Sequence, residues 1–179
     1  MRFLIRLKYM IVLIVLCVFV SCEQREITKK EIDSFINQYG KEDFSVFKGY
    51  TIEIRQHTFT ETIYIVSENQ EDNIGTTLFF VTFNKWSNNI SEISKRDALH
   101  DVFVTGTLTD EELTTIIKEY TKYNFVYLKV DKDNNIFINP FEMERRPFLL
   151  KLNNNSNTSM VKMYNYTFNQ YESDWYVRQ

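Results

Sequence analysis

The sequence has little of what several functional classes require. Its 179 residues include only 4 Gly, 2 Pro and 2 Cys, and the formal net charge is -3. Phosphate-cradling loops and dinucleotide fingerprints need closely spaced glycines, and the four glycines here are isolated. The small net charge gives no electrostatic case for nucleic acid. With 16% aromatic residues the chain can fill a core. We therefore expect a folded protein without a cofactor or a nucleic-acid partner.

The first residues have the form of a secretory signal. Arg2, Arg6 and Lys8 precede an uninterrupted apolar run over residues 9–20. A helix needs about 20 apolar residues to cross a bilayer, so this run is too short to span it. A short basic segment followed by a short apolar segment is typical of an export signal.

The apolar run ends in Phe19-Val20-Ser21-Cys22. This resembles the lipobox of bacterial lipoproteins, in which apolar residues and a small residue precede an obligatory Cys. The resemblance covers residues 1–22, and Phe19 departs from the Leu most often found at its position. It implies a signal peptide over residues 1–21, a diacylglycerol thioether on Cys22, and usually acylation of the new amino group, commonly by palmitate. It also implies a cell-envelope location on the inner or outer membrane.

The alternative for this segment is an uncleaved signal anchor over residues 3–20, with Cys22 incidental. Under the lipoprotein interpretation, residues 22–27 are a tether and residues 28–179 are the exported domain. Cleavage also removes Cys17, so an acylated Cys22 leaves no thiol for a disulfide.

Two helices are marked by their first residues. Thr28 with Glu31, and Thr109 with Glu112, have the spacing of a capping box, in which each side chain accepts a hydrogen bond from the other residue's amide. Apolar residues then follow at helical spacing as far as Tyr39 and Tyr120. Gly40 is expected to end the first helix in the left-handed conformation.

Most of the remaining sequence predicts strands. Successive strands with few helices between them cannot form a parallel sheet, so we expect the α+β class, an antiparallel sheet with helices on one face. Residues 84–101 have the least pattern and indicate a boundary between halves 28–105 and 106–179. The expected strands are residues 50–57, 60–67, 77–84, 102–105, 125–130, 135–139, 147–152, 160–169 and 174–178.

The two halves share a short similarity. Shifted by 81 positions, residues 28–48 match 109–129 at seven of 21 positions. Two explanations remain open. One is an internal duplication that gives two related helix-plus-sheet units. The other is convergence of the two sequences, because a capped amphipathic helix requires the same residue types in both segments.

The most specific local motif begins at Asp131. Oxygen-bearing side chains recur at Asp131, Asp133, Asn135 and Asn139, and Glu142 stands at position 12, which is similar to an EF-hand calcium loop. Position 6 is Ile136 instead of the required Gly, and the preceding residues indicate a strand. We favour a β-hairpin whose turn contains Asp133, Asn134 and Asn135 over a metal site.

Aromatic residues and histidines complete the candidates. Tyr164, Tyr166, Trp175 and Tyr176 suit a binding platform, although the alternation of Tyr164, Tyr166 and Phe168 favours a core. His57 is predicted to lie on a solvated strand face, and His100 lies between carboxylates. Neither belongs to a recognisable catalytic pattern, and the Gly-x-Ser-x-Gly elbow is missing from the sequence.

These features favour a lipid-anchored envelope protein with a non-catalytic binding or accessory role. Its expected partners are the membrane, through the lipid on Cys22, and an envelope protein or a glycan. The first alternative is a membrane-anchored immunity or inhibitor protein, since small acidic domains suit that role. The second is a small hydrolase acting on envelope polymers.

Overall fold

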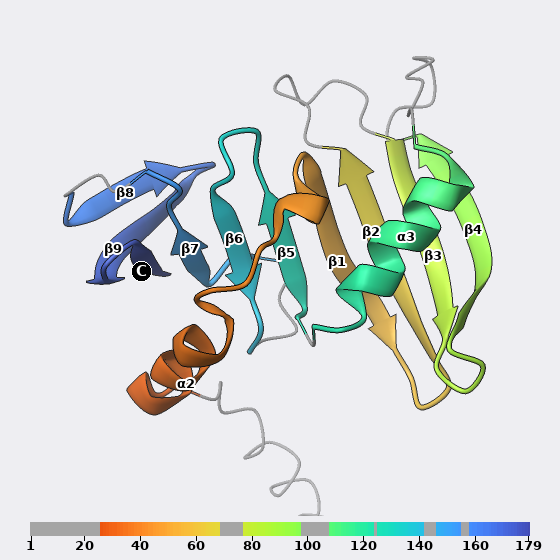
Figure 1. The fold of residues 1–179 in the computed structure, drawn as a ribbon, viewed down its shortest axis with the longest axis horizontal. Coiled ribbons are helices and arrows are strands. Elements are labelled where there is room, and N and C mark those ends of the chain that lie inside the picture. Colours follow the sequence, from red (N-terminus) through yellow and green to blue (C-terminus); the bar gives the residue numbers. More distant parts are fainter. Residues whose placement is uncertain (1–25, 69–76, 98–107, 124, 142–145, 155–157) are drawn as a thin grey trace, which may run out of the picture. The chain divides into compact units, whose positions relative to one another are not determined.

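The chain forms two compact units. The first ends at Lys41 and contains helix α2, and the second runs from Glu42 to Gln179 and contains the described strands. The computed structural model describes residues 26–68, 77–97, 108–123, 125–141, 146–154 and 158–179 (Figure 1). The described elements are α2 (Lys29–Tyr39), η1 (Ser45–Phe47), β1 (Tyr50–His57), β2 (Glu61–Glu68), β3 (Thr77–Asn84), β4 (Asn89–Asp97), α3 (Asp110–Tyr120), β5 (Tyr127–Val130), β6 (Ile136–Asn139), β7 (Leu149–Lys151), β8 (Met160–Met163), β9 (Tyr166–Glu172) and β10 (Trp175–Arg178).

Both helices begin with the predicted capping box. The Thr28 hydroxyl accepts from the Glu31 amide at 3.4 Å, and the Glu31 carboxylate accepts from the Thr28 amide at 2.9 Å. In α3 the corresponding distances for Thr109 and Glu112 are 3.2 Å and 2.8 Å. Each box satisfies two amides that have no partner inside the helix. The prediction of two capped helices is confirmed.

The end of α2 differs from the expectation. Gly40 has φ −61° and ψ −22°, which is the right-handed helical region, so the predicted left-handed stop is wrong. The Gly40 amide donates to the Ile36 carbonyl at 2.7 Å. The last turn therefore keeps its helical hydrogen bond, and no inversion of the backbone is needed there.

The ten strands of the described residues form one sheet. Their order is β4-β3-β2-β1-β5-β6-β7-β10-β9-β8. Every neighbouring pair is antiparallel, as the succession of strands predicts. The fold is thus dominated by an antiparallel sheet accompanied by helices. That both helices cover one face stays a prediction, because α2 belongs to the other unit.

Two expectations about strands are wrong. Residues 89–97, expected to be unpatterned, form the edge strand β4, which pairs with β3. Its alternation is weak because an edge strand in water tolerates polar and charged residues. Residues 160–169 are two strands, because Tyr164 and Asn165 adopt φ +49° and +66° and form the turn between β8 and β9. Residues 102–105 lie outside the described part.

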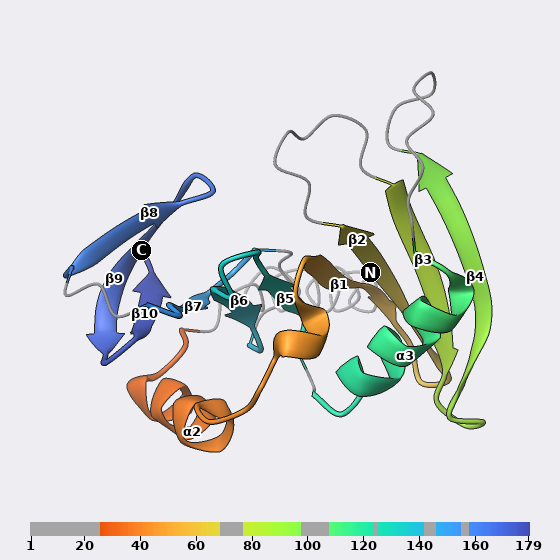
Figure 2. The same ribbon diagram turned by 45° about the horizontal axis from the view of Figure 1, so that its top comes forward.

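Helix α3 packs against one face of the sheet (Figures 1 and 2). The principal contact is the Tyr120 ring, which meets Tyr64 of β2 edge-on at 5.6 Å and Phe47 of η1 edge-on at 6.0 Å between centroids. The Tyr120 hydroxyl donates to the Phe125 carbonyl at 3.0 Å. Burial of this side chain raises the pKa of the Tyr120 phenol well above its ordinary value. The phenol therefore remains a neutral hydrogen-bond donor.

A second apolar cluster lies in the C-terminal half of the sheet. All four residues of β6 are buried, and Phe137 of β6 belongs to this cluster. By contrast, the residues of β3 alternate between buried and half-buried. The apolar run at residues 78–81 belongs to β3, which lies second from the edge of the sheet. The cluster consists of Tyr127, Phe137, Leu150, Leu152, Phe168 and Tyr176.

The similarity between the halves is confined to the helices. Residues 45–47 form a 3-10 helix, whereas the matched residues 126–128 lead into and begin β5. The first half continues as a simple meander, β1-β2-β3-β4, but in the second half β7 is followed in space by β10. Different strand orders favour convergence of two capped helices over duplication.

We predict that Tyr120 is the most sensitive position of this core. Tyr120→Phe should lower the free energy of unfolding by about 1–3 kcal/mol, because it leaves the Phe125 carbonyl without its donor. Tyr120→Ala should lower it by about 3–5 kcal/mol. Urea denaturation measures both changes, with Tyr50→Phe, a half-buried hydroxyl, as the control. A loss below about 1 kcal/mol for Tyr120→Ala would contradict the assignment.

Candidate binding cleft

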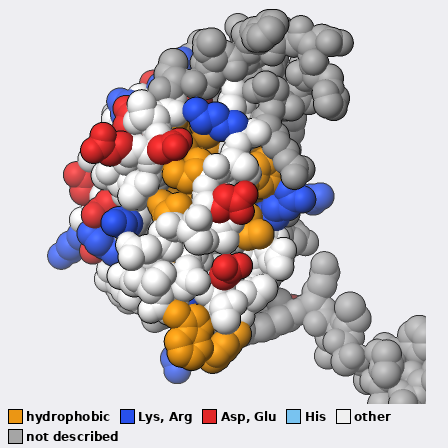
Figure 3. Space-filling view, turned by 90° about the vertical axis from the view of Figure 1, so that its right-hand side faces the viewer, with side chains coloured by type: hydrophobic (Ala, Val, Ile, Leu, Met, Phe, Trp, Pro, Cys, Tyr) orange, Lys and Arg blue, Asp and Glu red, His pale blue; other side chains and the backbone are white. Residues whose placement is uncertain are grey.

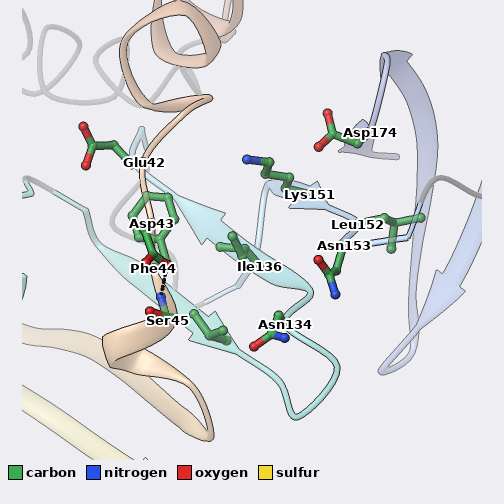
Figure 4. Close-up of a pocket in the computed structure, with 11 residues that line it drawn as sticks. Glu42, Asp43, Phe44, Ser45, Asn134, Ile136, Lys151, Leu152, Asn153 and Asp174 are labelled. Carbon is green, nitrogen blue, oxygen red and sulfur yellow. Dashed lines mark hydrogen bonds between the residues drawn. The ribbon is translucent and has the colours of Figure 1, made fainter.

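A cleft of about 430 Å³ opens within the second unit. Residues 42–45, which lead into η1, form one wall, and residues 151–153 at the end of β7 form another. Asp174 joins from the turn between β9 and β10. Figure 4 shows these side chains around the opening, with Asn134 of the β5–β6 turn on a third side. Segments distant in the sequence thus meet at one concave surface.

The cleft has an apolar floor and a charged rim. A buried floor favours the apolar part of a ligand, while the rim selects its polar groups. The lining contains three carboxylates and one lysine, so the rim carries an excess of negative charge. The floor consists of Phe44, Val130, Ile136 and Leu152. The rim consists of Glu42, Asp43, Ser45, Asn134, Lys151, Asn153 and Asp174.

Local interactions hold the charged groups of the rim. The Asp43 carboxylate accepts from the Ser45 amide at 2.8 Å, and this bond is the main reason that the pKa of Asp43 is lowered. The Lys151 ammonium lies 5.7 Å from the centre of the Trp175 ring, within the range of a cation–π contact. The Asp43 carboxyl is therefore ionised at neutral pH.

Sequence reasoning did not identify this rim. Asp43 and Ser45 have the spacing at which an Asp side chain binds the amide two residues later, so a local signal existed for that pair. Glu42, Lys151 and Asp174 are separated by more than twenty residues at each step and follow no motif. The strand order brings them together.

The Asp131 motif builds part of the cleft as a hairpin turn. The Asp131 carboxylate accepts from the amides of Asp133 at 2.9 Å and Asn135 at 2.8 Å, and also from the Asn135 side chain at 3.0 Å. Asn134 has φ +62°, a conformation that Asn tolerates. β5 and β6 pair across this turn, so the hairpin interpretation is confirmed.

The same turn is tied to the cleft wall. The Asn135 side-chain oxygen accepts from the Asn153 amide at 3.1 Å, and the Asn153 side chain donates to the Asp133 carbonyl at 3.0 Å. The side-chain oxygens of two candidate calcium ligands, Asp131 and Asn135, thus accept hydrogen bonds from amide groups of the protein. Glu142 lies outside the described residues, and no metal-binding group of acids, histidines or cysteines occurs within the described part.

The proposed aromatic platform is divided between core and surface. Trp175 and Tyr176 are 3% and 1% exposed, which confirms the favoured core interpretation for these two residues and excludes them from a binding platform. Both lie on β10, which pairs on each side with another strand. Tyr166 is half-buried, whereas Tyr164 is 51% exposed and carries the Lys129 ammonium 3.5 Å from its ring centre.

His57 has a defined structural environment. Its Nε2 lies 3.0 Å from the Lys85 ammonium and its Nδ1 lies 3.0 Å from the Thr62 hydroxyl. Since an ammonium only donates, Nε2 accepts and the imidazole proton is on Nδ1. Desolvation and the charge of Lys85 lower the pKa of His57, so the ring is neutral at pH 7. His100 lies outside the described residues.

We predict that calcium does not stabilise the protein through this turn. Adding calcium should leave the melting temperature unchanged, because the Asp131 oxygens are already bonded to amides. Asp131→Ala should lower the free energy of unfolding by about 1–3 kcal/mol, because buried donors lose their acceptor. Asp133→Ala, an exposed neighbour, is the control. A calcium-induced rise in melting temperature that Asp131→Ala abolishes would show that the turn is a metal site.

Comparison of the chain with known protein families, curated proteins and solved structures identifies no relative, so a functional proposal depends on the geometry of the cleft. No family model, no curated protein and no solved structure matches the chain. Residues 1–25, with the signal-like segment and Cys22, lie outside the described part, so the lipoprotein interpretation stays a prediction. No helix in the described stretches is long and apolar enough to cross a membrane.

Proposed function

We propose that this chain is a lipid-anchored cell-envelope protein that binds a ligand without transforming it. The lipobox-like residues 19–22 support attachment through Cys22, because the preceding apolar run is too short to span a bilayer. Multiple buried acyl chains give firm attachment, since each buried methylene contributes about 0.8 kcal/mol.

The cleft is the observation that carries the binding role. Its floor of Phe44, Val130, Ile136 and Leu152 accepts an apolar stem, and its acidic rim favours a positively charged end group. A lysine or arginine side chain combines these two properties. The ligand that fits best is therefore a basic segment of a peptide or an envelope protein.

The structural roles of the reactive groups support binding rather than catalysis. Asp131 holds the β5–β6 turn, His57 is neutral between Thr62 and Lys85, and Asp43 holds the backbone at Ser45. A catalytic acid or base must exchange protons with a substrate, which competes with these bonds.

Anchoring is tested by the cysteine substitution. We expect Cys22→Ser to release the protein from membranes or to leave it as an unprocessed precursor, because serine offers no thiol for the lipid. Detergent-phase partitioning and the mass of the amino-terminal peptide measure this, with Cys17→Ser as the control. Partitioning and processing unchanged by Cys22→Ser would exclude lipid attachment at that residue.

Binding is tested with an acetylated, amidated trilysine peptide. Titration should shift the NMR signals of Ser45, Asn134 and Asn153, which line the cleft. Asp174→Asn should weaken binding about fivefold, the upper range for a partly exposed ion pair, and salt should reduce the difference. Glu172→Gln removes the same charge from an exposed residue outside the lining and is the matched control.

The outcomes of this titration separate the ligand classes. A trimer of N-acetylglucosamine serves as the glycan probe in the same experiment. If the sugar shifts the cleft signals and the peptide does not, the ligand is a glycan and the basic-peptide assignment is wrong. If Glu172→Gln weakens peptide binding as much as Asp174→Asn, the effect comes from general charge and the cleft is not the site.

A further inference from the structure

Two large aromatic side chains project from neighbouring turns of the sheet. Phe59 lies in the β1–β2 turn and is 83% exposed, and Trp86 lies in the β3–β4 turn and is 74% exposed. Their rings contact each other edge-on, 5.8 Å apart between centroids. Hydrophobic side chains project at the end of the sheet where these turns lie (Figure 3). We name Phe59 and Trp86 together the aromatic tip.

Backbone hydrogen bonds hold the aromatic tip in place. The Lys85 amide donates to the Thr60 carbonyl at 2.9 Å and so joins the two turns. The Asn84 side-chain oxygen accepts from the amides of Trp86 at 2.9 Å and Ser87 at 3.0 Å. The rings are therefore presented by a connected pair of turns, which lowers the entropic cost of binding.

A cation lies at the base of the same turns. The Lys85 ammonium donates to the Thr58 carbonyl and contacts Nε2 of His57 at 3.0 Å. A positive charge on the residue before Trp86 is thus held against the residue before Phe59. Trp and Phe side chains accompanied by lysine are typical of protein segments at the boundary between lipid and water.

We propose that the aromatic tip contacts the surface of the bilayer to which the protein is attached. Trp86 and Phe59 enter the interfacial layer, and the positive charge of Lys85 attracts the lipid phosphates from its position in the turns. This inference rests on the proposed membrane anchoring and deepens it, because a second contact fixes which end of the sheet turns toward the membrane.

The size and shape of the aromatic tip favour a bilayer over a protein partner. Two aromatic side chains bury about 150–250 Å² each, whereas a stable protein interface buries about 800 Å² on each partner. A protein partner therefore needs a wider surface than these two turns provide. A bilayer has no fixed shape to match, and it accepts projecting aromatic side chains.

The test uses the mature protein, purified from membranes and reconstituted with vesicles of phosphatidylcholine and phosphatidylglycerol. The chain has two tryptophans, and Trp175 is buried, so the difference between wild type and Trp86→Phe isolates the emission of Trp86. We expect this emission to shift to shorter wavelength and to be quenched about twofold by lipids brominated on their acyl chains. Phe59→Ser should reduce the quenching, and Tyr164→Ser, at an exposed ring elsewhere, should not.

Sedimentation with the vesicles reports separately on anchoring. Protein that sediments but shows no quenching of Trp86 overturns the inference and leaves the anchor intact. Quenching that persists in Cys22→Ser supports the bilayer contact without the lipid. If the protein neither sediments with the vesicles nor shows quenching of Trp86, both the anchoring proposal and the bilayer contact are wrong. A shift of Trp86 emission that depends on protein concentration without vesicles assigns the aromatic tip to a second copy of the chain and overturns the inference.

Discussion

The second unit depends on one buried phenol. Tyr120 stands at the end of α3, and its ring contacts η1 and β2 while its hydroxyl binds the carbonyl of Phe125 just before β5. A single side chain thus connects the helix to both halves of the sheet. A phenylalanine supplies the ring contacts but not the hydrogen bond, and a buried carbonyl without a donor is costly. The position of α3 on the sheet therefore depends on the Tyr120 side chain, which buries a large ring and makes one hydrogen bond through its hydroxyl.

The cleft follows from a second constraint, the turn at Asp131. Its carboxylate organises three donors, which allows a tight connection between β5 and β6. Asn135 then extends this network to Asn153 on the chain after β7. Because the turn and the end of β7 are joined, the floor residues Ile136 and Leu152 and the rim residue Lys151 keep a fixed spacing. Structural hydrogen bonds thus determine the shape of the cleft.

The features that the sequence predicts are those set by neighbouring residues. Thr28 with Glu31, and Thr109 with Glu112, define both helix starts, because a capping box spans only four residues. The alternation at residues 50–57 gives the bounds of β1 for the same reason. The hairpin at Asp131 is also local, since its turn chemistry outweighs an incomplete calcium motif that lacks the required glycine.

The features that depend on distant parts of the chain are not predictable in this way. β4 carries the weak pattern of a polar edge strand, and its partner β3 identifies it. The full burial of Trp175 and Tyr176 requires β10 to lie between β7 and β9. The cleft has the same origin, because Glu42, Lys151 and Asp174 meet only after the strands have paired.

The aromatic tip differs from the other large aromatic residues in its exposure to water. Most large rings of the second unit have a partner in a core, as Tyr120, Phe137 and Phe168 do. Phe59 and Trp86 contact each other and are otherwise exposed to water. The hydrogen bond between the two turns holds the rings in this exposed position. Exposure of two apolar rings opposes the hydrophobic effect, which contributes about 25 cal/mol for each Å² removed from water. A surface that removes both rings from water recovers this free energy, and the membrane attachment that we propose supplies such a surface.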